Sequence, residues 1–171
     1  FIDKNETVSN KINVESMCDL ITYFKNTNIK ILFLSSDAVF NLEQKERNEF
    51  SEPCPSSIYG KQKYAVEQFL LDTIREQAMI LRLTKVLSKV SPVCQPLLMS
   101  NKEKFKGFTY KKNYFFAPIT LQFCIKNTLK VLEFNRAGVY HLSNEKIVSS
   151  YGLFYDLALR LKTVGQNKRF F

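Results

Sequence analysis

The sequence predicts an α/β fold built on a doubly wound parallel sheet. Residues 29–34 form a short, almost wholly apolar run with polar residues on both sides, which is typical of a strand buried on both faces. A second apolar run covers residues 78–87. Each run follows a segment in which apolar residues recur at helical spacing. Helices and strands that alternate in this way are the pattern of a doubly wound sheet.

The first half of the chain supplies two helices and a polar loop between the two strands. The first helix is expected over about residues 8–26, and the loop over residues 41–57, which are polar and contain two prolines. Ser56 or Ser57 is expected to cap the second helix, which runs to about Gln77. The residues expected to face the core are Val14, Met17, Ile21 and Phe24 of the first helix and Val66, Phe69, Leu70 and Ile74 of the second.

The second half of the chain has a more mixed pattern. A helix opened by a proline is expected over about residues 118–134, and a short strand over residues 138–142. Ser149 or Ser150 is expected to cap a last helix that ends near Gly165.

The composition is that of a globular protein. Hydrophobic residues make up 45% of the chain and charged residues 24%, which argues against disorder. No apolar run approaches the roughly 18 residues of a membrane span, and no signal-peptide pattern is visible. The sequence begins with Phe1 and not with methionine, so we expect a fragment or a processed product.

The cysteines and the single histidine argue against a metal site. The four cysteines are widely spaced and form no C-x-x-C motif, so we expect reduced thiols and a cytoplasmic protein. His141, in an apolar strand, is expected to be structural. The cysteines are Cys18, Cys54, Cys94 and Cys124.

The net charge of +9 favours anionic partners such as phosphorylated metabolites or nucleic acid. Most lysines are scattered and are interpreted as solvated surface. Residues 102–112 are the exception, because lysines alternate there with aromatic residues. Such a stretch is superficially similar to a nucleic-acid surface, with a solvated loop as the alternative.

Polar side chains stand where the first strand ends. Ser35, Ser36 and Asp37 follow the apolar run directly. In open α/β sheets, ligands bind beyond the carboxyl ends of the strands, so hydroxyls there are placed to face a ligand. The alternative is a serine–aspartate turn that only ends the strand.

Tyr59 and Lys63 lie four residues apart at the start of the second helix, which places both side chains on one face. An ammonium group beside a phenol is expected to lower the tyrosine pKa from its usual value of about 10. A tyrosine tuned in this way can exchange a proton with a carbonyl or alcohol oxygen. The alternative is an exposed pair with no function.

Several further segments occur in a recognisable order. After Ser-Ser-Asp-Ala-Val-Phe at residues 35–40 come the proline loop, Tyr-Gly-Lys-Gln-Lys at residues 59–63, Glu67 on the same helix, and Ile-Leu-Arg at residues 80–82. Asn-Val-Glu at residues 13–15 precedes them, and Phe-Ala-Pro-Ile-Thr at residues 116–120 and Gly-Val-Tyr-His-Leu-Ser-Asn at residues 138–144 follow. Over nearly its whole length, the chain resembles the extended short-chain dehydrogenases/reductases of the NAD-dependent epimerase/dehydratase superfamily. It is most similar to their dTDP-4-dehydrorhamnose reductase branch, whose strand ends in Ser-Thr-Asp-Tyr-Val-Phe.

The resemblance implies the C-terminal portion of a Rossmann-like doubly wound sheet, plus a small substrate-binding α/β lobe. Residues 1–90 would carry the catalytic residues, and residues 91–171 would be mostly the substrate lobe, with the chain crossing between the two. The implied cofactor is NAD or NADP, and the implied partner is a nucleotide-sugar substrate, with no nucleic acid and no membrane; a homodimer is compatible. In such a lobe, residues 102–112 would contact the diphosphate and base.

The resemblance also implies a role for each matching residue. Tyr59 would be the general acid, Lys63 would hold the nicotinamide ribose, and Ser36 would bind the reacting oxygen. The implied cofactor contacts are Tyr59, Lys63, Ser35 and Thr84, and the implied substrate contacts are Ser36, Asp37, Ala38 and Lys85.

Three departures from the family pattern limit what is implied. The Gly-rich phosphate turn of the family is absent, and none of the five glycines forms a G-x-G-x-x-G motif. Ala38 replaces a tyrosine of the rhamnose branch, and Lys85 replaces a tryptophan.

From the resemblance as a whole, we expect an NAD(P)-dependent nucleotide-sugar reductase that acts in dTDP-rhamnose or polysaccharide synthesis. Because the Gly-rich turn is absent, we expect the chain to lack the N-terminal section of such a protein. An epimerase or dehydratase of the same superfamily, and a non-catalytic binding or regulatory protein, are the alternatives.

Overall fold

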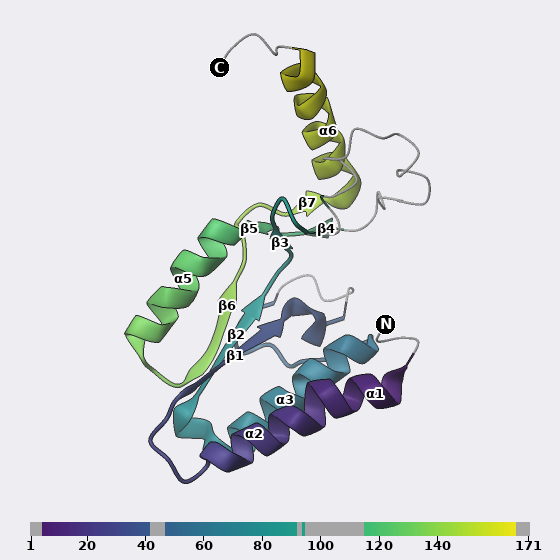
Figure 1. Ribbon diagram of the computed structural model, residues 1–171. Helices are drawn as coiled ribbons and strands as arrows, with labels where there is room; N and C mark the ends of the chain where they lie inside the picture. Colours follow the sequence, from purple (N-terminus) through teal and green to yellow (C-terminus); the bar gives the residue numbers. More distant parts are fainter. Residues whose placement is uncertain (1–4, 42–46, 92–93, 95–114, 167–171) are drawn as a thin grey trace. The chain divides into compact units, whose positions relative to one another are not determined.

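The computed structural model describes residues 5–41, 47–91, 94 and 115–166, and the side chains as far as residue 160 (Figure 1). The chain divides into two compact units. Unit 1 comprises residues 1–83 and 126–142, and unit 2 comprises residues 84–125 and 143–171. The sequence analysis placed the boundary between the catalytic part and the substrate lobe at residue 90. The catalytic and substrate-binding roles of the two parts remain predictions.

The chain enters unit 1 through a helix with an irregular centre. Helix α1 (Glu6–Asn10) leads into the π-helical turn η2 (Lys11–Glu15) and then helix α2 (Ser16–Phe24). The backbone N–H of Ser16 donates to the carbonyl of Lys11, five residues earlier, and its hydroxyl donates to the same oxygen at 2.9 Å. The sequence predicted a helix here but not the wider turn.

Unit 1 contains a three-stranded parallel sheet, which confirms the predicted α/β class (Figure 1). Its strands are β1 (Ile31–Ser36), β2 (Ala78–Leu83) and β6 (Gly138–Leu142), in the order β1-β2-β6. The sequence placed the strand at residues 138–142 correctly, whereas its second apolar run divides into β2 and a separate short strand.

Helix α3 (Ile58–Ile74) connects β1 to β2 and ends in the 3₁₀ turn η4 (Arg75–Gln77). The Ser57 hydroxyl accepts a hydrogen bond from the backbone N–H of Gly60 at 3.0 Å, so Ser57 is the predicted cap. Helices α2 and α3 cover one face of the sheet. The core between them consists of Ile21, Phe33, Val66, Leu70, Ile74, Ala78 and Ile80.

The other face of the sheet is only partly covered. Met79 and Leu81 of β2 are almost fully buried, but Leu34 of β1 is 46% exposed. Helix α5 (Leu121–Phe134), which leads into β6, lies away from α3 and carries exposed apolar residues of its own (Figure 1). The prediction that the first apolar run is buried on both faces is therefore wrong for this chain, because Leu34, on the face of β1 away from the Phe33 core, is exposed.

Among its described residues, unit 2 contains short strands, the first residues of α5 and a C-terminal helix. Strand β3 (Val86–Leu87) pairs in parallel with β5 (Ile119–Thr120), and β4 (Phe115–Phe116) pairs antiparallel with β7 (Val148–Ser149). Helix α6 (Ser150–Gln166) is capped by the Ser149 hydroxyl, which accepts from the N–H of Gly152 at 3.0 Å. Either Ser149 or Ser150 was predicted here.

The start of α5 differs from the prediction. The sequence placed the helix opening at Pro118, but Ile119 and Thr120 first form β5, because the backbone N–H of Ile119 donates to the carbonyl of Lys85. The helix then begins at Leu121. A proline can open a helix, but here the two residues that follow Pro118 pair with β3 as a strand.

Three other features follow from the described part of the chain. All four cysteines are free thiols. None of the described helices has the length and apolar character needed to cross a membrane. No group of histidine, cysteine and acidic side chains in the described ranges is arranged to hold a metal ion. The basic and aromatic residues 102–112 lie outside the described residues.

Candidate active site

The end of β1 presents Ser36 at the start of a tight turn. The Ser36 hydroxyl accepts from the backbone N–H of Ala38 at 3.2 Å, which caps the 3₁₀ turn η3 (Asp37–Val39). The same hydroxyl donates to the Asp37 carboxylate at 3.2 Å. These two bonds hold the oxygen of Ser36 in place without burying it, so it can meet a ligand beyond the strand end.

Gly60 allows the start of α3 to lie directly against this turn. A Cβ atom at Gly60 would stand 2.0 Å from the carbonyl oxygen of Ala38 and 2.9 Å from its carbonyl carbon. Both are backbone atoms, so they cannot move aside as a flexible side chain would. Only glycine therefore permits this approach, which brings Tyr59 to Ser36.

Tyr59 lies close enough to Ser36 for the serine hydroxyl to affect its pKa. Burial raises the pKa of Tyr59, the Ser36 hydrogen bond lowers it by less, and the negative charge of Asp37 raises it further. The net direction is upward, so the expectation that the tyrosine pKa is lowered is wrong for this chain. The reason is that desolvation of the half-buried ring outweighs the stabilisation of the phenolate. Tyr59 consequently keeps its proton at neutral pH.

Lys63 lies one helical turn after Tyr59 and is turned toward the strand. Its Nζ donates to the carbonyl of Leu34 at 2.9 Å and lies 4.6 Å from the ring centroid of Phe33. The distance from Nζ to the Tyr59 ring centroid is 5.8 Å. Burial lowers the pKa of Lys63, and the charge of Glu67 partly opposes that effect. The lysine is thus beside the phenol but is positioned by the backbone of β1.

The other predicted site residues lie in different surroundings. Ser35 is 4% exposed, and its hydroxyl has no hydrogen-bond partner in the described part of the molecule. Thr84 and Lys85 belong to unit 2, where the Thr84 hydroxyl donates to the carbonyl of Ala117 at 2.6 Å. Lys85 is exposed, and its role remains a prediction. The structure therefore brings together Ser36, Asp37, Tyr59 and Lys63.

A buried polar network that the sequence did not reveal joins α3 to the N-terminal helix and the π-helical turn. The amide of Asn13, in the π-helical turn, donates to the Gln62 side chain at 2.9 Å, and Gln62 donates to the Ser9 hydroxyl at 2.9 Å. Gln62 is 4% exposed and Ser9 is fully buried. Asn13 and Gln62 were signalled only as parts of the Asn-Val-Glu and Tyr-Gly-Lys-Gln-Lys segments, and no pattern signalled Ser9.

A buried ion pair joins α3 to β2. Arg82 donates to Glu67 through Nε and through Nη2, the latter at 2.7 Å, and both side chains are almost fully buried. Its Nη1 lies 3.3 Å from Nε2 of His141, whose ring contacts Phe40 edge to face. Burial lowers the pKa of His141. This histidine belongs to the packing between β2 and β6, as predicted.

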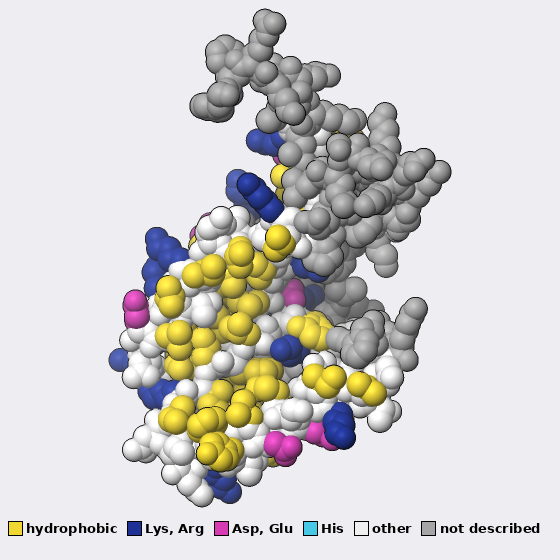
Figure 2. Space-filling model, in the orientation of Figure 1, with side chains coloured by type: hydrophobic (Ala, Val, Ile, Leu, Met, Phe, Trp, Pro, Cys, Tyr) yellow, Lys and Arg dark blue, Asp and Glu magenta, His cyan; other side chains and the backbone are white. Residues whose placement is uncertain are grey.

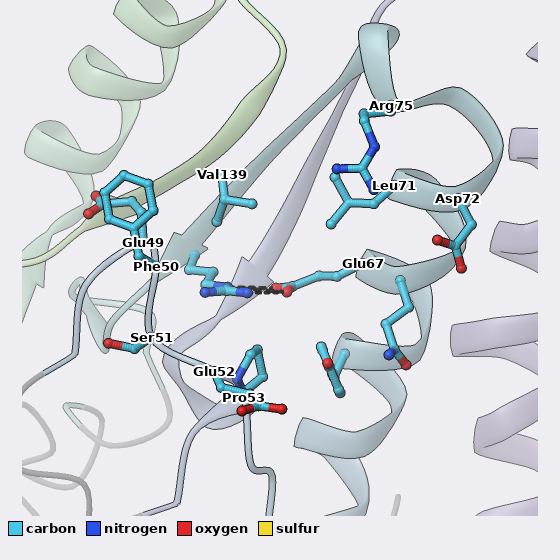
Figure 3. Close-up of a pocket in the computed structure, with 13 residues that line it drawn as sticks. Glu49, Phe50, Ser51, Glu52, Pro53, Glu67, Leu71, Asp72, Arg75 and Val139 are labelled. Carbon is cyan, nitrogen blue, oxygen red and sulfur yellow. Dashed lines mark hydrogen bonds and ion pairs between the residues drawn. The ribbon is translucent and has the colours of Figure 1, made fainter.

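The ion pair borders a pocket of about 440 Å³ that contains none of the predicted site residues (Figure 3). The pocket lies between α3, the strands β2 and β6, and residues 49–53. Figure 3 shows Glu67 and Asp72 extending from α3, with dashed lines for the ion pair of Glu67 with Arg82, and Arg75 extending from the following turn η4. Its charged residues are mainly acidic, and it is distinct from the Ser36–Tyr59–Lys63 cluster.

Comparison with known families decides the identity of the chain. A model of the family described as RmlD substrate binding domain matches residues 2–166. The chain belongs to the RmlD substrate binding domain family. The predicted resemblance to the extended short-chain dehydrogenases/reductases, in their dTDP-4-dehydrorhamnose reductase branch, is thereby confirmed. Comparison with curated proteins gave no match.

Solved structures share the fold of this RmlD family member. It is similar to a dTDP-4-dehydrorhamnose reductase from Bacillus anthracis in complex with NADP, with a TM-score of 0.79 and 22% identity over 96% of this chain and 57% of that one. The corresponding reductase from Clostridium acetobutylicum has a TM-score of 0.79 and 23% identity over 96% and 57% of the two chains. A dTDP-glucose 4,6-dehydratase from B. anthracis in complex with NAD has a TM-score of 0.75 and 14% identity, over 90% and 53%. The chain thus spans a little over half the length of these proteins.

Proposed function

We propose that this chain is the catalytic part of an NAD(P)-dependent nucleotide-sugar reductase. The observation that carries the proposal is the position of Tyr59 beside Ser36 beyond the carboxyl end of a parallel strand, with Lys63 on the same helix face. A ligand oxygen that approached this strand end would meet two hydroxyls at once. Two convergent hydroxyl groups of this kind suit the polarisation of a single carbonyl oxygen.

The protonation state of Tyr59 is compatible with reduction. With its pKa above the usual tyrosine value, Tyr59 carries its proton at neutral pH, as an ordinary tyrosine does, and can donate it to an oxygen that gains negative charge. Ser36 would bind the same oxygen and hold the tyrosine hydroxyl toward it. Asp37, beside Ser36, would contact the sugar.

The residues present fit one part of a nicotinamide cofactor. Lys63 uses one N–H on the Leu34 carbonyl, which leaves two donors for ribose hydroxyls. Ser35 offers a buried hydroxyl without a partner, which is a candidate further contact. When bound, the cofactor would supply the hydride. The sequence contains no Gly-rich turn for the pyrophosphate, so the full cofactor site requires residues beyond those present.

A 4-keto nucleotide sugar is the proposed substrate, because two similar structures are dTDP-4-dehydrorhamnose reductases. Activity in dTDP-rhamnose or polysaccharide synthesis in the cytoplasm is part of this proposal. The second candidate is a nucleotide-sugar epimerase or dehydratase, favoured by the similarity to the dTDP-glucose 4,6-dehydratase. The two differ in stoichiometry: a reductase consumes NAD(P)H, whereas an epimerase returns the hydride to its substrate.

Steady-state oxidation of NAD(P)H by the protein from the complete reading frame tests the proposal. With a panel of 4-keto nucleotide sugars, Tyr59→Phe is expected to lower kcat by ~10²–10⁴, as for loss of a general acid. Tyr64→Phe, on the same helix and also a loss of one hydroxyl, is the matched control and is expected to retain activity. Full activity of Tyr59→Phe would refute the assignment. No turnover by the wild type on any panel member would favour the non-catalytic alternative.

A further inference from the structure

Among the described residues, Glu67 and Arg82 are the two charged residues whose side chains are buried. Arg82 is 5% exposed, whereas Figure 2 shows lysine and arginine side chains at the surface of the molecule, in dark blue. A buried ion pair adds little net stability compared with apolar residues of similar size, because both charges lose their water. Stability alone therefore gives little reason for this pair.

The guanidinium group of Arg82 meets three different elements. Its Nε and Nη2 donate to the Glu67 carboxylate of α3, its Nη1 lies 3.3 Å from Nε2 of His141 on β6, and its central carbon lies 5.1 Å from the ring centroid of Phe40. Because an arginine can only donate, His141 accepts through Nε2. One planar group thus connects α3, β6 and the segment that follows β1.

Phe40 leads from Arg82 to the strand-end half of the proposed site. Its backbone N–H donates to the carbonyl of Asp37 at 3.1 Å, which closes the turn η3, and the Ser36 hydroxyl caps the same turn. The Phe40 ring is buried and also contacts His141 edge to face. A close-packed ring of this kind cannot move alone, so a shift of Phe40 would displace the turn that carries Ser36 and Asp37.

Glu67 leads from Arg82 to the helix half of the proposed site. It follows Lys63 by four residues and Tyr59 by eight on α3, so all three lie within about two turns of one continuous helix. Glu67 is fully buried, and its carboxylate accepts hydrogen bonds of 2.7 Å and 3.1 Å from Arg82. The place of this carboxylate therefore fixes where the start of α3 lies along the sheet.

We propose that Arg82 is a positioning residue, which holds Ser36 at the strand end and Tyr59 on the helix at the separation that their joint action on one oxygen needs. It acts through Phe40 on one side and through Glu67 on the other. This proposal rests on the proposed reductase function, but the contact that it concerns exists without substrate and can be measured without it.

A double variant that removes the ion pair without leaving a buried charge tests the proposal. In Glu67→Leu/Arg82→Met, apolar side chains replace both charges, so the Tm of the protein from the complete reading frame should stay close to that of the wild type. The coupling between Ser36 and Tyr59 is the upward change in the Tyr59 pKa that Ser36→Ala causes, measured by ¹³Cζ-tyrosine NMR. This coupling should be present in the wild-type background and lost in the double variant.

Turnover gives a second readout. With a 4-keto nucleotide sugar and NAD(P)H, kcat of the double variant should fall about 10²-fold, as for a displacement of reacting groups by about 1 Å. Arg75→Met is the matched control, because it removes an exposed arginine that borders the same pocket, and it should change neither the coupling nor kcat.

A conservative variant keeps the test decisive if the double variant does not fold. Arg82→Lys retains the charge beside Glu67, but an ammonium group cannot bond Glu67 and His141 while it packs flat on Phe40. It should therefore also weaken the coupling. Full coupling in a folded Arg82→Lys would overturn the proposal.

Two further results would overturn it. The Ser36–Tyr59 coupling could survive in a double variant of wild-type stability, which would make the ion pair purely structural. Alternatively, the wild type could show no coupling for Arg82 to maintain. Loss of the coupling in the variants would support the proposal even if the wild type reduced no sugar, a result that would refute only the proposed reductase function.

Discussion

At the scale of single residues, Tyr59 is controlled by two neighbours that act in opposite directions. The Ser36 hydrogen bond lowers its pKa, and the charge of Asp37 raises it, while burial sets the overall upward direction. Each neighbour can be removed without changing the size of the site greatly. The electrostatic account therefore makes predictions with definite signs.

Asp37→Asn is expected to lower the Tyr59 pKa, because it removes a negative charge that disfavours the phenolate. In the complete protein, reduction requires protonated Tyr59 and declines as pH rises through its pKa, so this limb of the pH profile should move to lower pH. Ser36→Ala is expected to raise the pKa. Titration of ¹³Cζ-labelled tyrosine by NMR, with Tyr59→Phe to assign the signal, measures both. A Tyr59 pKa that moves upward in Asp37→Asn would contradict this account.

Gly60→Ala tests the close approach of α3 to the Asp37–Val39 turn. The new methyl group would meet the Ala38 carbonyl, so the change should destabilise the protein by roughly 1–3 kcal/mol, as other overpacked sites do. Gly152→Ala is the matched control, since it is also the third residue of a helix but faces the movable Ser149 hydroxyl at 2.8 Å. Urea unfolding measures both. Equal effects at the two positions would argue that Gly60 has no special contact.

Lys63→Met is expected to raise the KM for the cofactor in the complete protein, because it removes the ammonium group that is placed by the Leu34 carbonyl. The pKa of Tyr59 is dominated by burial, Ser36 and Asp37, so the alkaline limb of the pH profile should move little. Lys61→Met, an exposed lysine on the same helix, is the control. A large shift of the limb would show that Lys63 controls the phenol directly.

At the scale of elements, the sequence predicted the strands and helices that hold the site and missed features that depend on distant contacts. The alternation of apolar runs revealed β1, α3 and β2, and serine caps were expected at both helix starts where they occur. The π-helical turn η2 was not predicted, because its extra residue is accommodated by contacts of Asn13 with another helix. The direction of the Tyr59 pKa was mispredicted for a related reason: residue spacing shows which charge is near, but not how far the ring is buried.

The ion pair between Glu67 and Arg82 makes a prediction about the contact of α3 with β2. Glu67→Leu leaves the Arg82 guanidinium buried without its carboxylate and should cost about 3–5 kcal/mol. Adding Arg82→Met should recover much of this loss, because neither partner is then left charged. A double-mutant cycle by urea unfolding measures the coupling. Additive effects of the two changes would contradict the ion pair.

At the scale of the whole molecule, the chain brings together Ser36, Tyr59 and Lys63, which we propose as the catalytic residues, and it contains only part of the proposed cofactor site. The family and the fold class could be predicted from the sequence because both depend on local order along the chain. The arrangement of unit 2 could not, since strands of two residues such as β3 and β4 leave too few positions for a pattern. The sequence indicated that the apolar run of β1 needs neighbours on both faces, and the N-terminal section that would supply them was expected to be missing.

The isolated chain is therefore expected not to bind NADH or NADPH measurably, because no helix start with a Gly-rich turn is present to hold the pyrophosphate. It is also expected to be marginally stable and prone to aggregation through the open edge of β1. Fluorescence titration measures binding, and light scattering during thermal unfolding measures association. Micromolar binding, or a cooperative transition of a monomer, would contradict these two expectations.

The central claim is that the complete protein reduces a nucleotide sugar with Tyr59 as the proton donor. The most direct measurement supplies NAD(P)H deuterated at the transferred position together with a 4-keto nucleotide sugar, and follows the label by mass spectrometry. The account predicts that deuterium accumulates in the sugar product in step with cofactor oxidation, at a rate that falls ~10²–10⁴-fold in Tyr59→Phe. Unlabelled product formed without net cofactor oxidation, or labelled product formed at the wild-type rate by Tyr59→Phe, would contradict it.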